Sequence, residues 1–339
     1  IKLIKNLGTR IKNAKNGRVV LATATPIVDS PSDAEKIMDI VHGSKSRKRD
    51  DGYISWFMNR PENVFARTNP AANQIPLIVE VPLKGENLKK YLTEVKGKTT
   101  KSSLQTYENS TLYHFTDKTI GAKQSKLADD GASIASKLDQ LVKDVKESGL
   151  KTAILMDRRN GLKLLHAMFL AQGVTCHMMF GPAATPVSVR DREASHNDAL
   201  RQAFNAKNNV RGERIQVLLL DSKDYSEGVS LSNVRHIILA DMSPGLEDGK
   251  GKPSWGRLKK RVGRALRFCS HRDLPADESI LKISMYVATA SDATGQIIKT
   301  VDQKKLDIIR KQQALVEAAM CALEAKSIDA TLYGPSDCA

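Results

Sequence analysis

The sequence predicts an α/β protein whose main part is a parallel β-sheet with helices on both faces. The first observation is that helical and strand patterns alternate along residues 127–290. The second is a pair of short apolar runs, residues 217–220 and 236–240, each bounded by turn residues. Such runs are typical of strands covered on both faces of a parallel sheet. Right-handed crossovers would place the carboxyl ends of these strands along one edge, where such folds bind ligands.

The chain before residue 96 contains two predicted strands and one predicted helix. Residues 19–21 have the apolar composition of a strand. A helix over residues 31–41 follows, because Ser30 precedes Pro31 at the first helical position. Apolar residues alternate with others over 74–83, which predicts a strand with one packed face.

Two prolines and a change in composition mark the end of this first part. Pro76 and Pro82 place the strand over 74–83 at a sheet edge, because proline cannot donate a hydrogen bond to a neighbouring strand. Residues 96–126 are rich in Lys, Ser, Thr and Gly, which predicts a linker or a mobile insert. We therefore place a domain boundary there, with residues 1–95 before it.

The second part, residues 127–290, begins with a helix that Gly149 is expected to end. Its apolar residues recur at helical spacing, at Ile134, Leu138, Leu141 and Val145. The elements that follow are a strand over 152–156, a helix over 162–171, a strand over 174–180, a helix over 195–205, the strands over 217–220 and 236–240, a strongly basic helix within 258–271 and a strand over 280–287. Residues 291–339 form a helical extension, which contains one long amphipathic helix over 301–325.

The charge balance predicts a polyanionic partner. The chain has 339 residues and a formal net charge of +15, although its 41% hydrophobic and 27% charged residues are ordinary for a globular protein. Nucleic acid is the first candidate for such a partner, and an anionic membrane surface is the second. A basic protein that binds neither is the alternative that composition leaves open.

Several classes of site are disfavoured. The four cysteines lie far apart without a C-x-x-C pair, and the seven histidines show no metal-binding spacing, so we expect no metal site and no disulfide framework. His236 is expected to be a hydrogen-bonded core or edge group. No run of 18 apolar residues and no signal peptide is present, so neither a membrane-spanning segment nor entry into the secretory route is predicted.

The candidate site consists of a glycine-containing loop and a group of arginines. The loop, residues 226–231, follows a strand at the expected ligand-binding edge. Arg261, Arg264 and Arg267 are spaced one helical turn apart, so they are expected to share a helical face. Three guanidinium groups on one face repel one another unless an anion lies opposite, and the planar fork of arginine matches phosphate.

Two of these stretches, and a third near the start of the chain, resemble motifs of superfamily 2 helicases. Residues 226–231, Ser-Glu-Gly-Val-Ser-Leu, resemble the fifth motif, and residues 260–267 resemble the sixth, Q-R-x-G-R-x-x-R, with Lys260 in place of the glutamine. Residues 23–26, Thr-Ala-Thr-Pro, resemble the third motif. The extension over 268–275 narrows the resemblance to the helicase-like ATPases of large cytoplasmic DNA viruses, of the poxvirus nucleoside triphosphatase and early transcription factor type.

This resemblance implies a RecA-like fold, with the end of a first RecA-like domain in residues 1–95 and a second over residues 127–290. It implies catalytic roles for Arg264 and Arg267 as arginine fingers. Residues implied to contact the nucleotide are Gly228, Ser230, Lys260 and Arg261. Residues implied to couple the nucleotide to nucleic acid are Thr23, Ala24, Thr25, Glu227 and Val229. His271 would position the sixth-motif helix.

The resemblance also implies cofactors, partners and a location. The cofactors would be ATP and Mg²⁺, and the nucleic acid would be DNA rather than RNA, with a multisubunit RNA polymerase as a further partner. The location would be the host cytoplasm, within the viral factory, or the virion. The chain begins at Ile1 and contains neither a G-x-x-x-x-G-K-[ST] loop nor a D-E-x-[HD] motif. We therefore expect the C-terminal half of a longer ATPase, in which ATP and Mg²⁺ bind mainly to the first domain, and which is inactive alone.

Two other functions are alternatives to this interpretation of the sequence. Because Lys260 departs from the sixth motif, the chain could be a non-catalytic, helicase-derived component of a virion or of an RNA polymerase complex. The retention of Arg261, Arg264 and Arg267 argues against that hypothesis. A membrane-surface protein is disfavoured, because no basic amphipathic helix carries Trp or Phe on its apolar face.

Overall fold

The computed structural model describes Ile27 and residues 30–42, 66–71, 74–96, 135–157, 160–179, 190–222, 229–242, 253–267 and 269–325. The predicted strand over 19–21, the third-motif stretch over 23–26 and most of the predicted linker over 96–126 lie outside the described residues. The chain divides into two compact units. One comprises residues 1–59, 254–256 and 309–339, and the other comprises residues 60–253 and 257–308.

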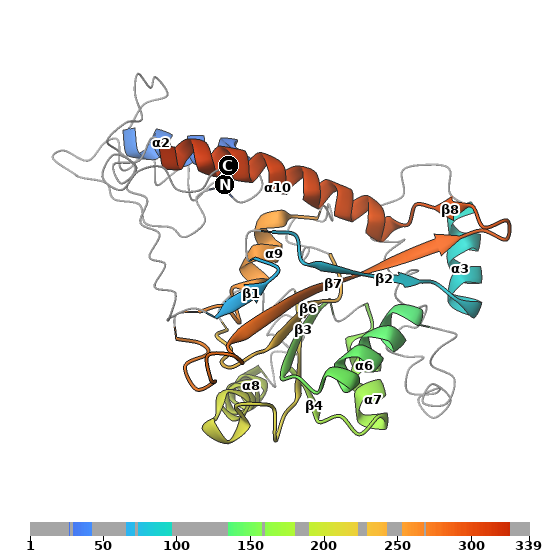
Figure 1. Ribbon diagram of the computed structural model, residues 1–339, viewed down its shortest axis with the longest axis horizontal. Coiled ribbons are helices and arrows are strands. Elements are labelled where there is room, and N and C mark those ends of the chain that lie inside the picture. The colour runs from blue at the N-terminus through green and yellow to red at the C-terminus, as the bar shows by residue number, and fades with distance from the viewer. Residues whose placement is uncertain are drawn as a thin grey trace. The chain divides into compact units, whose positions relative to one another are not determined.

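The larger unit is built on an eight-stranded sheet with the order β1-β7-β6-β3-β5-β4, to which β2 and β8 add by pairing with β7 (Figure 1). Every described pair is parallel except β7 with β8. The strands are β1 (Arg67–Asn69), β2 (Leu77–Pro82), β3 (Thr152–Met156), β4 (Cys176–Met179), β5 (Val217–Asp221), β6 (His236–Leu239), β7 (Ile280–Ser291) and β8 (Ile297–Ile298).

Both faces of the central strands are covered. Every residue of β3, β5 and β6 is buried, although successive side chains point to opposite faces. Ile154 and Leu219 pack in one cluster with apolar residues of α6 (Ser136–Ser148) and α7 (Leu162–Ala171). Helix α8 (Arg190–Asn205) lies on the other side of the sheet (Figure 1). The predicted α/β fold, a parallel sheet with helices on both faces, is confirmed.

Local sequence explains where these helices end. Gly149 has φ 62°, and its N–H donates to Val145 O at the end of α6. A left-handed residue at this position costs glycine little, because it has no Cβ. The predicted bounds of β3, α7 and the long helix α10 (Val301–Ala325) agree with the structure.

Strands β1 and β2 lie on the same sheet as the later strands. Leu77 to Pro82 pair in parallel with residues 284–289 of β7, and β7 is long enough to pair with β1, β2 and β6. The described part of β2 has no second partner, so the edge position predicted from Pro76 and Pro82 is confirmed. These strands precede the boundary placed at residues 96–126 but complete the sheet that follows it.

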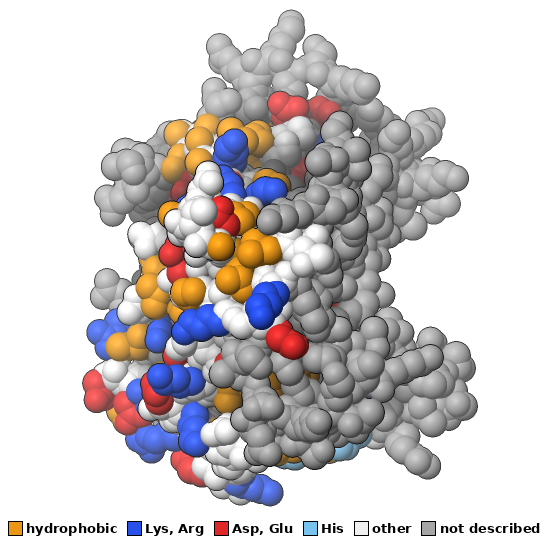
Figure 2. Space-filling view, turned by 90° about the vertical axis from the view of Figure 1, so that its right-hand side faces the viewer, with side chains coloured by type: hydrophobic (Ala, Val, Ile, Leu, Met, Phe, Trp, Pro, Cys, Tyr) orange, Lys and Arg blue, Asp and Glu red, His pale blue; other side chains and the backbone are white. Residues whose placement is uncertain are grey.

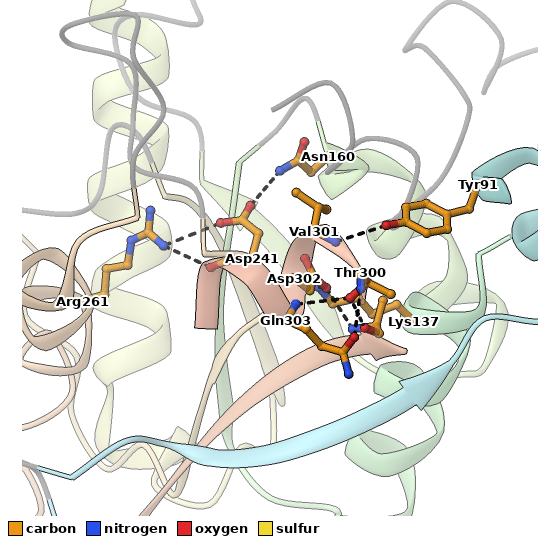
Figure 3. A network of polar contacts seen from close by, with 10 residues as sticks. Tyr91, Lys137, Asn160, Asp241, Arg261, Thr300, Val301, Asp302 and Gln303 are labelled. Carbon is orange, nitrogen blue, oxygen red and sulfur yellow. Dashed lines mark hydrogen bonds and ion pairs between the residues drawn. The ribbon is translucent and has the colours of Figure 1, made fainter. Parts of the chain in front are cut away.

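The start of α10 is fixed to the sheet by a buried polar network (Figure 3). Lys137 Nζ lies 2.7 Å from Asp302 Oδ2, with both side chains 0% exposed, and Ala288 N donates to the same oxygen. Thr300 N donates to Gln303 Oε1, and Gln303 N donates to Thr300 Oγ1. This reciprocal pair satisfies two backbone donors at the beginning of the helix.

The remaining described helices are α2 (Ser32–His42), α3 (Gly85–Lys96), the 3₁₀ turn η5 (Lys207–Asn209) and α9 (Trp255–Val262). None of the helices in the described ranges is long and apolar enough to cross a membrane. Figure 2 views the side on which β8 and α3 lie in Figure 1, and there Lys and Arg are interspersed with acidic and hydrophobic side chains. On the described part of this face, positive charge does not form one continuous patch.

Candidate functional site

The fifth-motif and sixth-motif stretches lie side by side in the larger unit. Leu231 N donates to Arg264 O at 2.9 Å, and Asn233 N donates to Ser270 O at 2.7 Å. Two irregular segments that are far apart in sequence are therefore joined by backbone hydrogen bonds. We call residues 229–234 the motif-five loop. A displacement of this loop would be transmitted to the residues after α9.

Asp241 is the centre of a buried cluster at the carboxyl end of β6 (Figure 3). Its Oδ2 accepts from Asp157 N at 2.5 Å and from Asn160 Nδ2 at 3.1 Å. Arg261 Nη1 lies 3.6 Å from Asp241 Oδ1 and donates to Asp241 O at 3.3 Å. Because the two side chains are 2% and 0% exposed, removing either partner would take this ion pair away from a charge that stays buried.

Arg264 is also engaged within the unit. Its Nε donates to Lys260 O at 3.0 Å, and its Nη1 donates to Val229 O at 3.4 Å. The residue is 8% exposed. Val229 and Arg264, two predicted site residues, are therefore brought together, and Arg264 contacts the motif-five loop through both its backbone and its side chain.

Arg267 differs from the other two arginines. It is exposed, and only its backbone has hydrogen-bond partners among the described residues, because its N–H donates to Ser270 Oγ at 3.2 Å and its carbonyl oxygen accepts from Ser270 N at 3.0 Å. Its guanidinium group makes no hydrogen bond or ion pair with the described part of the chain. A cation in this position can receive a phosphate without giving up a hydrogen bond or ion pair to the described residues.

The prediction that Arg261, Arg264 and Arg267 share one helical face is wrong. Helix α9 ends at Val262, and Arg264 N donates to Arg261 O instead of Lys260 O. The side chain of Arg264 takes the Lys260 carbonyl oxygen that its own backbone would bind in a continuing helix. The chain therefore tightens into turns, and two guanidinium groups point into the protein while the third is exposed.

His271 connects the residues after α9 to the motif-five loop. Its Nε2 donates to Val234 O at 2.6 Å, and its Nδ1 lies 2.8 Å from Ser270 Oγ. Burial lowers the pKa of His271, the bond to Val234 O partly opposes this change, and the positive charge of Lys151 lowers the pKa further. These contacts join the residues after α9 to Val234 of the motif-five loop. The role of His271 in positioning the sixth-motif helix stays a prediction.

The other predicted site residues are placed as follows. Val229 is buried, Ser230 is exposed and Lys260 is half-buried. Thr23, Ala24, Thr25, Glu227 and Gly228 lie outside the described residues. Across the described ranges, no group of three or more His, Cys, Asp or Glu side chains is arranged to hold a metal ion.

Sequence reasoning missed Asp241 and Asn160. The available signal was position, because Asp241 follows the buried run 236–240 directly and so falls at the ligand-binding edge. His236 was correctly expected to be a hydrogen-bonded core group. Its Nε2 lies 2.9 Å from Ser284 Oγ, and burial, with a smaller effect of Lys282, lowers its pKa to about 3.

The chain is similar in sequence to several known helicases and related proteins. No protein-family profile matches the chain. It is 22% identical over 382 residues to an ATP-dependent RNA helicase of Acanthamoeba polyphaga mimivirus, covering 94% of the chain and 62% of that protein. It is 22% identical to a killer plasmid helicase of Kluyveromyces lactis, covering 90% of the chain and 49% of that protein. A termination factor NPH-I homolog of African swine fever virus is 24% identical over 57% of the chain and 27% of its own length.

Solved structures give weaker likenesses. The C-terminal part of the Fun30 ATPase domain is 12% identical, with a TM-score of 0.41, and covers 76% of this chain and 97% of its own. Dbp5 of S. cerevisiae, bound to RNA and ADP BeF₃, is 16% identical, with a TM-score of 0.35, and covers 53% of this chain and 37% of its own. The fold assignment rests on the strand order of this chain and not on these scores.

The sequence relatives are helicases and nucleoside triphosphatases. The chain is a distant relative of superfamily 2 helicase-like ATPases, among them viral nucleoside triphosphatases and NPH-I homologues. It spans between a quarter and about three fifths of the length of the relatives described above.

Proposed function

We propose that this chain is the C-terminal half of an ATP-dependent nucleic-acid helicase or translocase that acts in viral transcription. The observation that carries the proposal is the pairing of the motif-five loop with the residues after α9, beside an arginine whose side chain has no partner in the described part of the chain. A loop that contacts nucleic acid and an arginine that contacts phosphate would then move together.

The three arginines have separate roles in this proposal. Arg267 offers an exposed guanidinium group to a phosphoryl group. Arg264 would join it only after a rearrangement that releases internal contacts, among them its bonds to Val229 O and Lys260 O. Arg261 keeps its place against Asp241. An arginine finger contributes roughly 10³ to 10⁵ in rate to related phosphoryl transfers.

The cofactor would be ATP with Mg²⁺, held mainly by the first domain. Bound ATP supplies the phosphoryl group that is transferred. The residues of this chain that fit it are cationic donors, Arg264 and Arg267, with Lys260 nearby in sequence. Ser230 is exposed on the motif-five loop and can donate a hydrogen bond to a phosphate oxygen.

The nucleic-acid partner is proposed from charge and from the relatives. A formal charge of +15 favours contacts with the phosphate backbone, so binding should tolerate any sequence and weaken with salt. DNA is proposed over RNA, and a multisubunit RNA polymerase is proposed as a further partner. The proposed location is the viral factory of the host cytoplasm, or the virion.

A specific observation favours the second candidate, a non-catalytic structural component. Arg261 and Arg264 both bind acceptors within their own unit, which is the behaviour of packing residues. This candidate predicts that Arg267 can be replaced without any effect on ATP hydrolysis.

ATP hydrolysis by the full-length protein tests the proposal, measured with and without DNA and RNA. Arg267→Ala should lower the nucleic-acid-stimulated rate by about 10³ or more. Arg272→Ala is the matched control, because the Arg272 side chain is 71% exposed and makes only a 3.8 Å ion pair with Asp273. Equal activity of the two variants, or no hydrolysis by the wild type, would favour the structural component.

A further inference from the structure

The residues after α9 form hydrogen bonds with only some of the backbone polar groups of the motif-five loop. Its backbone is irregular, and Val229, Leu231 and Val234 are buried. Buried backbone groups need hydrogen-bond partners. The loop after α9 and its His271 provide partners for Leu231 N, Asn233 N and Val234 O. The groups between them, on Ser230 and Ser232, are paired from a different element.

That element is the end of α8. Asn205, its last residue, donates from Nδ2 to Ser230 O at 2.9 Å and accepts from Ser232 N at its Oδ1 at 2.8 Å. A primary amide carries a donor and an acceptor side by side, so one asparagine can bridge two residues of a neighbouring backbone. Aspartate would lose the donor, and alanine would lose both bonds.

Lys151 reinforces the same connection. Its Nζ donates to Ser232 O at 2.9 Å and to Phe204 O at 2.7 Å. The Nζ also lies 4.4 Å from the centre of the Phe204 ring. Phe204 precedes Asn205 at the end of α8, and Lys151 is 0% exposed. The backbone of Ser232 is therefore connected to the end of α8 in two ways. Its N–H donates to Asn205, and its carbonyl oxygen accepts from Lys151, which also donates to Phe204 O.

We infer that Asn205, supported by Lys151, is a positioning residue that holds the motif-five loop against the arginines after α9. With Asn205 on one side and Arg264 O on the other, residues 230–232 are bound from two directions. Asn205 lies outside the three helicase-like motifs of the sequence and acts on the loop through its two hydrogen bonds. The inference rests on the proposed function for its catalytic consequence, but not for its structural one.

Amide hydrogen exchange of the full-length protein tests the structural consequence. Asn205→Ala should speed exchange at Leu231 and Ser232 by about tenfold, because two hydrogen bonds no longer oppose opening of the loop. Exchange in β3 should stay unchanged. Asn208→Ala is the matched control, since Asn208 is exposed and three residues further on. Unchanged exchange in the Asn205→Ala protein would overturn the inference.

Kinetics of the same variants test the catalytic consequence. Asn205→Ala and Asn205→Asp should lower the nucleic-acid-stimulated kcat by about tenfold with little change in the KM for ATP, because the loop would be misplaced and the nucleotide would not. An unchanged stimulated kcat would refute the positioning role even if exchange increases. If the wild type hydrolyses no ATP, the proposed function fails, and the exchange result alone decides whether Asn205 holds the loop.

Discussion

Replacing Asp241 by asparagine should destabilise the larger unit strongly. The side chain of Asp241 is 0% exposed and faces the Arg261 guanidinium group, which is 2% exposed. The Asp241→Asn variant keeps the shape but removes the negative charge, so the buried Arg261 guanidinium group loses its ion pair with Asp241. Breaking a buried pair in this way costs about 3–5 kcal/mol of unfolding free energy. The bond from Asp157 N would also lose its charge assistance.

A double-mutant cycle in urea separates the pair from its surroundings. Arg261→Met alone should also destabilise, because it leaves the carboxylate buried without its cation. The double variant Asp241→Asn/Arg261→Met should recover part of the summed loss, which measures the coupling between the two side chains. Asp198→Asn, which removes an exposed partner of Arg201, should leave the unfolding midpoint nearly unchanged. If the losses at Asp241 and Arg261 are small and additive, the buried cluster does not stabilise the unit.

Two further predictions concern pH. Burial raises the pKa of Asp139 to about 6, and its Oδ2 has no hydrogen-bond partner in the described part of the chain. Between about pH 4 and 6 the folded state therefore binds a proton that the unfolded state has lost, and the free energy of unfolding falls as the pH rises through this range. The Asp139→Asn variant should have a free energy of unfolding about 1–2 kcal/mol higher than the wild type at pH 7.5, after allowance for the partial exposure of Asp139. The effect of His236 on the pH dependence is opposite, because burial lowers its pKa to about 3. The unfolded state binds a proton at this histidine below pH 6.5 and the folded state does not, so the free energy of unfolding should fall by about 1.4 kcal/mol between pH 7.5 and 5.5. Urea unfolding of His236→Gln and Asp139→Asn at both pH values checks each slope, and variants with the wild-type slope would contradict the assignments.

The sequence predicted the elements that depend on local pattern. Strand β3 and helices α7 and α10 were placed correctly, because buried runs and helical spacing are properties of short segments. The sixth-motif helix was too long, because Arg264 uses its side chain to bind a carbonyl that a regular helix would reserve for the backbone. Spacing alone cannot show that competition.

Long-range partners of the site were not predictable from pattern. Asn160 and Asp241 are 81 residues apart in sequence, but Asn160 Nδ2 lies 3.1 Å from Asp241 Oδ2. Asn205 donates a hydrogen bond to Ser230 O in the motif-five loop, 25 residues further along the chain. Strands β1 and β2 join the sheet across the whole predicted linker. These pairings depend on which strands become neighbours, and a single sequence does not specify that order.

Arg261 and Arg267 should have different roles within the sixth-motif stretch, one in stability and the other in ATP hydrolysis, and conservative substitutions can separate these roles. Arg261 is buried and paired, so Arg261→Lys should lose unfolding free energy, because lysine cannot reproduce the contacts of a planar guanidinium group with Asp241. Arg267 is exposed and its side chain has no described partner, so Arg267→Lys should melt like the wild type. Its effect should instead be on ATP hydrolysis by the full-length protein, where a point charge replaces a two-pronged donor. If Arg267→Lys lowers the melting temperature as much as Arg261→Lys does, Arg267 is a packing residue, and its role as an arginine finger fails.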